Sequence, residues 1–363
     1  MMNIVFRVDA APHMGGGHLS RCLTLANGLK KKGFTSLFIL RNHPNCPSHQ
    51  VTNAGHSLVL LPFQNENTVD VNSYTSWVGA SWDFDAEQTL KAMTEQFNHD
   101  VDWLIVDHYG LDACWEEYFL SKGIKIGVID DLVNRTHSSR FLLDQTCGRV
   151  EEEYKGLVSR GTTLFVGERY CLLRDEFFQL RESAISRRKQ LKTVRKLLIN
   201  FGSTDPTGHT LKALKGLKRY AVETDVEVLI VVGSACPFIY EIKEASESLP
   251  YKVKLYIDST SMAELIKDSD LAIGAAGVST WERCFLGLPT LLVKTAENQT
   301  DVVQRVIRSG AAIGYFENLE CENSLLLALK NMEKDYSNVS ESALNMDIGG
   351  GLDKVITLIT EDM

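Results

Sequence analysis

The sequence predicts an α/β protein made of two Rossmann-like domains, each with a parallel sheet. Short apolar runs alternate with longer stretches of helical periodicity along the 363 residues. Most of the short runs are apolar throughout, which is typical of strands buried on both faces of a parallel sheet. Each half of the chain opens with such a run followed by a glycine-containing turn, which favours two domains of similar size.

The first half is expected to contain five strands. They are predicted at residues 4–8, 36–40, 57–61, 103–106 and 125–129. A helix is expected over 19–32, because its apolar residues share one stripe and it ends in three lysines followed by Gly33, which is a common helix stop. Residues 64–85 have little periodicity and predict a long loop or a pair of short helices.

A polar, basic stretch at residues 182–196 separates the halves, either as a domain boundary or as a solvated helix face. The second half is expected to contain strands at residues 197–201, 226–232, 252–256, 271–273 and 290–293. We therefore expect a first domain over 1–185 and a second over 186–345. A C-terminal helix in 346–363 is expected to pack back on the first domain.

Charge and composition exclude several classes of protein. With 38 basic and 47 acidic residues the net charge is −9, so binding to nucleic acid or to an anionic membrane is not expected. No apolar run reaches the roughly 18 residues of a membrane span, and the N-terminus lacks signal-peptide features, so a cytoplasmic protein is expected. The eight cysteines have no zinc-type spacing. We expect no metal and no cofactor, and favour a monomer, although the sequence leaves the oligomeric state open.

In open α/β sheets, ligands bind beyond the carboxyl ends of the strands. The first strand is followed by Gly15, Gly16 and Gly17, whose backbone N–H groups can approach a ligand closely. His18 follows in the first helical turn, where the positive helix end disfavours imidazolium, so it is expected to be neutral and to accept a proton. Arg21 shares its face and could meet an anion. A tight turn with a capping histidine is the alternative.

Further acidic and aromatic groups follow the strands of the first half. Asp107, His108 and Tyr109 come directly after the fourth strand, either as functional groups or as the start of a helix cap. Asp9 follows the first strand, and the pair Asp130-Asp131 follows the fifth. Any of these acids could orient the imidazole of His18, and the sequence leaves open which one does.

The second half contains two loops of the type that binds phosphate. The first loop consists of Gly202, Ser203, Thr204 and Asp205, and a plain strand-to-helix turn is its alternative. The second loop contains Gly277, Ser279 and Thr280 and leads to Glu282, which could bind two ribose hydroxyls or cap its own helix. A polar pair, Asn298 and Gln299, follows the last strand. Together these loops predict a nucleotide-sugar site in a cleft between the domains.

The ordered series of these motifs resembles the UDP-2,4-diacetamido-2,4,6-trideoxy-β-L-altropyranose hydrolases of pseudaminic acid biosynthesis. The resemblance spans nearly the whole chain. The motifs that carry it are Arg7-Val8-Asp9, Gly15-Gly16-Gly17-His18, Arg21-Cys22-Leu23, Leu25-Ala26, Asp107-His108-Tyr109-Gly110, Asp130-Asp131, Tyr170, Leu173-Arg174-Asp175-Glu176-Phe177, Gly202-Ser203-Thr204-Asp205, Ser279-Thr280-Trp281-Glu282, Asn298-Gln299 and Asp347-Ile348-Gly349-Gly350-Gly351.

The resemblance implies a GT-B fold, with two Rossmann-like domains facing across a cleft, related to the MurG-type glycosyltransferases. It implies hydrolysis of a UDP-sugar by water, without a metal, to UDP and a free sugar that feeds a nonulosonic acid for flagellin or other surface glycans. The His after the glycine loop, here His18, is the implied base. Arg174 and Glu282 match the substrate-binding Arg and Glu of the family.

Other functions remain open at this stage. A GT-B glycosyltransferase that moves a sugar to an acceptor would carry the same nucleotide loops, and so would a hydrolase or hydrolysing epimerase acting on another UDP-sugar. A nucleotide-sugar-binding protein without catalytic activity is disfavoured, because binding alone needs no base at His18. A dehydrogenase is disfavoured because the glycine loop does not have the GxGxxG spacing.

Overall fold

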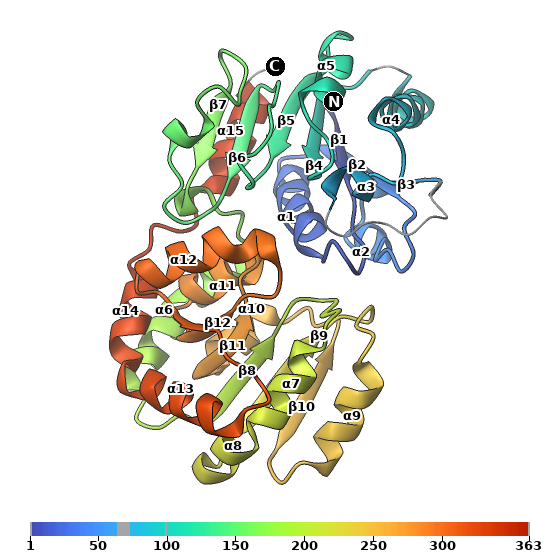
Figure 1. The fold of residues 1–363 in the computed structure, drawn as a ribbon. Helices are drawn as coiled ribbons and strands as arrows, with labels where there is room; N and C mark the ends of the chain where they lie inside the picture. The colour runs from blue at the N-terminus through green and yellow to red at the C-terminus, as the bar shows by residue number, and fades with distance from the viewer. Residues whose placement is uncertain (1, 64–72, 99, 362–363) are drawn as a thin grey trace. The chain divides into compact units, whose positions relative to one another are not determined.

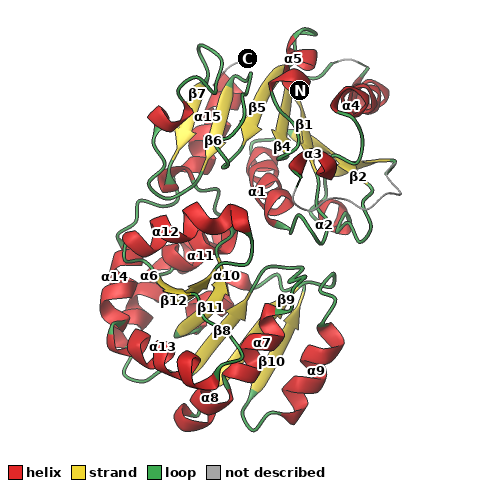
Figure 2. Ribbon diagram, in the orientation of Figure 1, coloured by secondary structure: helices red, strands yellow, loops and turns green. Residues whose placement is uncertain are grey.

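The computed structural model describes residues 2–63, 73–98 and 100–361. The chain divides into two compact units (Figure 1). Unit 1 comprises residues 1–172 together with 349–363, and unit 2 comprises residues 173–348. Each unit has a parallel sheet covered by helices on both faces (Figure 2).

The sheet of unit 1 has seven parallel strands in the order β3-β2-β1-β4-β5-β6-β7. The strands are β1 (Asn3–Val8), β2 (Thr35–Arg41), β3 (Ser57–Leu61), β4 (Trp103–Asp107), β5 (Lys125–Ile129), β6 (Phe141–Asp144) and β7 (Thr163–Val166). The chain order reverses beside β1, which pairs with both β2 and β4. At such a switch point the connecting loops diverge and leave room for a ligand.

Helices cover both faces of this sheet because successive strand residues point to opposite sides. On one face α1 (Gly17–Lys31) and α15 (Gly351–Glu361) pack on Ile4 and Phe6. On the other face, α4 (Trp82–Phe97) and α5 (Ala113–Leu120) pack on Val5 and Leu104. The shorter helices are α2 (His49–Asn53), α3 (Tyr74–Trp77), η1 (Glu151–Tyr154) and η2 (Glu168–Tyr170).

The sheet of unit 2 has six parallel strands in the order β10-β9-β8-β11-β12-β13. The strands are β8 (Lys196–Asn200), β9 (Glu227–Val232), β10 (Val253–Ile257), β11 (Leu271–Ala275), β12 (Thr290–Val293) and β13 (Ile313–Tyr315). The order reverses between β8 and β11, which is the second switch point.

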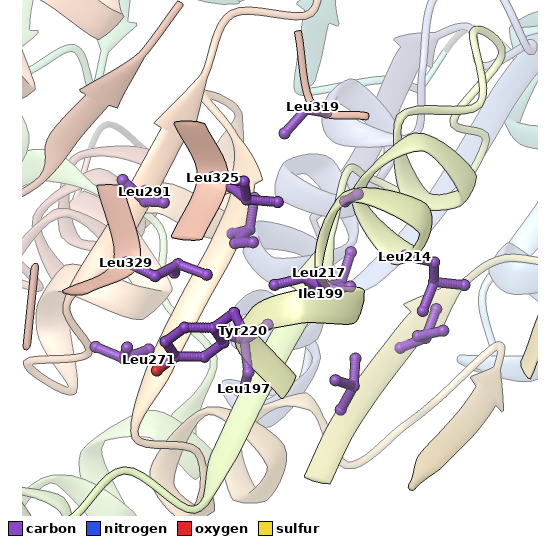
Figure 3. Close-up of a cluster of buried hydrophobic side chains, with 14 of the residues drawn as sticks. Leu197, Ile199, Leu214, Leu217, Tyr220, Leu271, Leu291, Leu319, Leu325 and Leu329 are labelled. Atoms are coloured by element: carbon purple, nitrogen blue, oxygen red, sulfur yellow. The ribbon is translucent and has the colours of Figure 1, made fainter. Parts of the chain in front are cut away.

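The helices of unit 2 pack on both faces of its sheet. Figure 3 shows the core on one face, where Tyr220 and Leu325 pack beside strand residues such as Leu197 and Ile199. The helices are α6 (Asp175–Gln190), α7 (His209–Gly216), α8 (Lys218–Thr224), α9 (Ile239–Ser248), α10 (Met262–Asp268), α11 (Val278–Phe285), η3 (Glu297–Gln299), α12 (Thr300–Arg308), α13 (Glu322–Lys334) and α14 (Tyr336–Leu344). Helix α6 lies against α10, α11 and α14.

The two parallel sheets confirm the predicted fold class, and every strand expected from the sequence is present. The sequence analysis missed β6, β7 and β13, which have only three or four residues each and therefore give little periodic signal. Part of the unpatterned stretch at 64–85 lies outside the described residues, and the rest contains α3 and the start of α4. None of the described helices is both long and apolar enough to span a membrane.

Helix α6, through which the expected domain boundary ran, lies entirely in unit 2. Its side chains explain why. Arg181 donates hydrogen bonds to the carbonyl oxygens of Phe285 and Leu344, and Arg188 donates to that of Ile266, all within unit 2. The second unit therefore begins at residue 173 rather than at 186.

The C-terminal helix α15 belongs to unit 1 and packs on α1. A close backbone approach positions its first turn. A Cβ atom added to Gly351 would lie 1.9 Å from the carbonyl oxygen of Tyr170. Gly350 donates a backbone hydrogen bond to Arg169, and an added Cβ there would be 3.3 Å from the nearest atom. Only glycine fits at 351 without moving one of the two segments.

We predict that Gly351→Ala lowers the free energy of unfolding by about 3 kcal/mol, because the methyl group forces α15 away from η2. Gly350→Ala, the matched control, is expected to cost less than about 1 kcal/mol. Urea unfolding followed by circular dichroism measures both. Equal losses in the two variants would show that the close approach at Gly351 does not hold the helix.

Candidate active site

The glycine loop of unit 1 leads from the switch-point strand β1 into α1. Gly15 has a φ of +76°, which favours glycine, and its backbone N–H donates to the carbonyl oxygen of Ala11 at 2.9 Å. Gly16 is the N-cap residue of α1, and Gly17 begins the helix. The turn therefore places His18 in the first helical turn, beside the carboxyl end of β4.

His18 forms a buried pair with Asp107, the last residue of β4. The Nδ1 atom of His18 lies 2.6 Å from Oδ1 of Asp107, and His18 is only 8% exposed. At this distance Nδ1 carries the proton and donates it to the carboxylate, because the carboxylate can only accept. In a neutral ring the lone pair then resides on Nε2. Of the acids that the sequence left open, Asp107 is thus the one that orients His18.

Arg21 neutralises Asp107 from one helical turn further along α1. Its Nε and Nη2 atoms donate to the two carboxylate oxygens at 2.6 and 2.8 Å. Burial by itself raises the pKa of Asp107, but the charges of Arg21 and His18 outweigh burial and lower the pKa to about 2. The carboxylate therefore stays ionised at neutral pH. The guanidinium of Arg21 is committed to this role and to Asp131, whose Oδ2 lies 2.8 Å from Nη1.

Tyr109 extends the cluster on the side of the imidazole ring. Its ring meets that of His18 edge to face, with centroids 4.4 Å apart, and its hydroxyl donates to Oδ1 of Asp131. Burial raises the pKa of Tyr109 well above its usual value, and the negative charge of Asp131 adds to the effect. The phenol is therefore protonated and held in place. Tyr74 and Trp77 of α3 lie against the other side of the tyrosine ring.

Asp9 and His108 belong to a second buried network rather than to the His18 cluster. Asp9 accepts two hydrogen bonds from Arg7 and one from the backbone N–H of Arg41. Arg7 also binds Asp85 of α4. The Nδ1 atom of His108 accepts a hydrogen bond from the N–H of Gly110, and its Nε2 lies 3.2 Å from Asp9. These contacts hold the chain in place after β1 and β4.

Asp130 and its neighbour Asp131 have different partners. Its Oδ1 lies 2.7 Å from Arg135, and its Oδ2 lies 3.7 Å from His137, whose Nδ1 is 2.7 Å from Glu116. Burial disfavours the charged ring, but the two carboxylates outweigh burial and raise the pKa of His137 to about 9. Asp130 is therefore used inside the fold, whereas Asp131 reaches the His18 cluster with its side chain 22% exposed.

The first loop of unit 2 follows β8. Gly202 is exposed and has a φ of +92°, and the carbonyl oxygen of Ser203 accepts a hydrogen bond from Gly233 after β9. Both carboxylate oxygens of Asp205 accept backbone N–H groups at the start of α7. Asp205 therefore caps the helix, which leaves the backbone at 202–204 as the part of the loop able to meet a ligand.

The second loop of unit 2 connects β11 to α11. Gly277 is exposed, and a Cβ added there would meet nothing within 4 Å of it. Ser279 is half-buried, and its hydroxyl accepts a hydrogen bond from Arg283. Thr280 is buried, and its hydroxyl donates to the carbonyl oxygen of Ala275. The exposed backbone of the loop and the positive end of an eight-residue helix together favour an anion.

Glu282 and Arg174 lie together in unit 2. The Nη2 atom of Arg174 is 3.1 Å from Glu282, and its Nη1 is 3.1 Å from Glu176. Burial raises the pKa of Glu282, and Arg174 partly opposes the shift. A carboxylate held in this way on α11 can accept hydrogen bonds from a diol.

Asn298 and Gln299, the polar pair after β12, differ in their contacts. Gln299 uses its side-chain oxygen to accept hydrogen bonds from the backbone and hydroxyl of Thr295, at 2.9 and 3.0 Å. Gln299 therefore closes its own loop. Asn298 is half-buried in the same short helix, η3.

Sequence reasoning found His18, Asp107, Arg21 and Tyr109, which the structure brings together. It missed Arg283, although the spacing of four residues from Ser279 on a helix is a signal that could have found it. Within the residues that the structure describes, no three His, Cys, Asp or Glu side chains are grouped so that they could hold a metal ion.

The histidine between Glu116 and Asp130 predicts a pH dependence of stability. Because the pKa of His137 is about 9 in the folded state and about 6.5 unfolded, its stabilisation is complete below pH 6.5 and is lost as the pH rises through 9. The stability difference between wild type and His137→Gln should therefore shrink by about 3 kcal/mol from pH 6 to pH 10. Urea titrations measure it, with His49→Gln, at an exposed histidine, as the control. A difference that does not change with pH would contradict the assignment.

Comparisons with known proteins agree with this architecture. Residues 201–347 match the model of the glycosyltransferase family 28 C-terminal domain. The chain is 23% identical to the UDP-2,4-diacetamido-2,4,6-trideoxy-beta-L-altropyranose hydrolase of Campylobacter jejuni over 86% of this chain and 99% of that protein. It is 25% identical to an uncharacterised protein of Methanocaldococcus jannaschii over 83% of this chain, but the match spans only 57% of that protein.

Among solved structures, MurG of Acinetobacter baumannii has a TM-score of 0.67 at 14% identity, covering 99% of this chain and all of that one. At this identity the likeness concerns the fold alone. The resemblance inferred from the motifs is confirmed over most of the chain by the Campylobacter relative. The chain therefore has the GT-B fold, and residues 201–347 of its second unit are similar to the glycosyltransferase family 28 C-terminal domain.

Proposed function

We propose that the chain is an enzyme that hydrolyses a UDP-sugar to UDP and the free sugar, with His18 as the base that activates water. The observation that carries the proposal is the buried contact between His18 and Asp107, which assigns the proton to Nδ1 and the lone pair to Nε2. Arg21 keeps Asp107 ionised, so the carboxylate stabilises the imidazolium that forms when Nε2 takes a proton.

The UDP moiety is assigned to the two loops of unit 2. The backbone at 202–204 and the loop from Gly277 to Ser279 offer N–H groups and a hydroxyl to the diphosphate. Glu282 is assigned to the ribose hydroxyls, with Arg174 beside it. Support comes from the match of residues 201–347 to a glycosyltransferase C-terminal domain and from the exposure of the loop backbones.

In the proposed reaction the bond between C1 of the sugar and the phosphate oxygen breaks, and a bond forms from C1 to the oxygen of water. Nε2 of His18 takes one proton from the water, and the electron pair of the broken bond leaves with UDP. Attack on the face opposite UDP inverts the configuration at C1. A base of this type contributes about 10²–10⁴ to the rate. Donors in the unit 2 loops stabilise the charge that develops on the leaving phosphate.

For the sugar we propose 2,4-diacetamido-2,4,6-trideoxy-β-L-altropyranose, on the basis of the name of the Campylobacter jejuni relative and the motifs shared with that family. The free sugar would then feed the synthesis of pseudaminic acid or a related nonulosonic acid. A related UDP-sugar with the same loops around UDP is the nearest alternative substrate.

A glycosyltransferase that moves the sugar to an acceptor is the second candidate. The observation in its favour is the domain match of residues 201–347, together with the fold shared with MurG. The same base could deprotonate an acceptor hydroxyl instead of water, so the acceptor decides between the two reactions.

We predict that the purified chain, incubated in ¹⁸O-water with the UDP-linked sugar, EDTA and no acceptor, releases UDP and places ¹⁸O in the free sugar. Mass spectrometry of both products makes the measurement. Label in UDP would mean attack at phosphorus and would contradict the role of His18. Absence of turnover without an acceptor would favour the transferase.

We predict that His18→Asn lowers kcat by about 10²–10⁴-fold, because the water loses its base, while the affinity for UDP changes less than about twofold. His49→Asn, the same substitution at an exposed histidine of α2, is the control and should leave both unchanged. Steady-state kinetics and calorimetric UDP titration measure the two effects. A variant at position 18 with near-wild-type kcat would remove the base from the mechanism.

A further inference from the structure

Arg283 lies on α11 behind the second loop of unit 2. It is 1% exposed, and its guanidinium reaches back toward the start of its own helix. Its Nη2 donates to the carbonyl oxygen of Ala275 at 2.8 Å and approaches the hydroxyl of Thr280 at 3.3 Å, while Nη1 donates to the hydroxyl of Ser279 at 3.0 Å. The side chain thus connects both ends of the loop.

Strand β11 leaves space for the guanidinium of Arg283 because position 274 is a glycine. A Cβ added to Gly274 of β11 would lie 2.8 Å from Nη1 of Arg283 and 3.1 Å from its Cζ, so the guanidinium lies directly against the strand. A side chain at position 274 would displace it. The close fit indicates that the guanidinium is held at the carboxyl end of β11, at the switch point.

Arg283 forms no ion pair with a described residue, although the charge of its neighbour Glu282 acts on it from beyond ion-pair distance. The structure gives it hydrogen bonds to a carbonyl and two hydroxyls, but no carboxylate within ion-pair distance, and its Nε has no hydrogen-bond partner. Burial lowers the pKa of Arg283 to about 10, so it is still charged at neutral pH. A buried cation without an ion pair is costly and calls for an explanation.

A second buried arginine of unit 2, Arg188, has a hydrogen-bond acceptor for each of its guanidinium nitrogens. All three guanidinium nitrogens of Arg188 donate to carbonyl oxygens, and those of Ile266 and Ser269 lie at the C-terminal end of α10, where the helix dipole is negative. Arg283 is in the last turn of α11, but its guanidinium reaches back to Ser279 and to the carbonyl of Ala275 at the start of the helix, where the dipole is positive. The positive end of the α11 dipole and the charge of the Arg283 guanidinium therefore both raise the electrostatic potential at this loop.

We propose that Arg283 is a positioning residue for a nucleoside diphosphate at this loop. Its hydrogen bonds hold Ser279 and the carbonyl of Ala275 in place in the loop, and its positive charge, which no ion pair with a described residue neutralises, favours the diphosphate. The proposal rests on the proposed function, and extends it by assigning the preference for the charged part of the nucleotide to a residue that does not itself line the loop. The bound anion adds a counter-charge to that of Glu282, which lies beyond ion-pair distance.

The experiment compares UDP with uridine, which lacks the diphosphate. Calorimetric titrations of both ligands are made on wild type, Arg283→Gln and Arg283→Lys. We expect Arg283→Gln to weaken UDP binding about tenfold or more while uridine binding changes less than about twofold, since only the charged group feels the lost charge. Arg283→Lys keeps the charge and should lose less than about threefold for UDP.

Arg188→Gln is the matched control, because it removes a buried arginine of the same unit whose charge is compensated. It should lower thermal stability and leave the ratio of UDP to uridine affinity unchanged. Equal losses for UDP and uridine in Arg283→Gln would reduce Arg283 to a structural support of the loop and would overturn the proposal. So would equal UDP affinity in the Gln and Lys variants.

The two proposals fail in different ways. If wild type binds neither UDP nor uridine, the proposed function fails. If wild type binds UDP but the selectivity of Arg283→Gln for UDP over uridine is that of wild type, only the role of Arg283 fails. Should Arg283→Gln not fold, Arg283→Lys decides, because a tenfold loss of UDP affinity with the charge retained contradicts the proposal.

Discussion

A carboxylate buried at the end of a central strand determines the geometry of the candidate site in unit 1. Asp107 ends β4 with no exposure to solvent, and the fold can bury its charge only because Arg21 donates two hydrogen bonds to it. The same carboxylate fixes the ring of His18. Charge compensation and orientation of the base are therefore one interaction, and both partners come from the first two turns of α1.

The other buried charges of unit 1 serve this arrangement by making the strand ends rigid. Asp9, Asp85 and Arg7 join β1 to α4, and Asp130 with His137 secures the loop after β5. Each acid is matched by a cation, so few polar groups in these loops are free to reorganise. Rigid strand ends help to keep His18 in the orientation needed to take a proton from water. A displacement of the reacting groups by about 1 Å would lower the reaction rate considerably.

The sequence predicted both sheets and most of the site, because strand ends are easily located in apolar runs and parallel sheets gather the residues that follow them. His18, Asp107 and Tyr109 were found in this way. The pairing of acids was not predictable. Asp9 was as good a partner for His18 as Asp107 until the structure placed Arg7 beside it. Short strands such as β13 were not predicted because three residues give little periodic signal, and the boundary at α6 was not predicted because it depends on tertiary contacts.

Two buried arginines beside the candidate loops, Arg21 in unit 1 and Arg283 in unit 2, differ in their partners. In unit 1 the guanidinium of Arg21 is fully used by Asp107 and Asp131, so the cluster around His18 has little net positive charge to offer an anion. In unit 2, Arg283 forms no ion pair with a described residue, and its guanidinium reaches back to the positive end of α11. The His18 cluster has little net positive charge to oppose protonation of the base. The positive charge of Arg283, which no ion pair with a described residue neutralises, attracts a diphosphate. This contrast in charge agrees with the proposed assignment of water activation to unit 1 and of the nucleotide to unit 2.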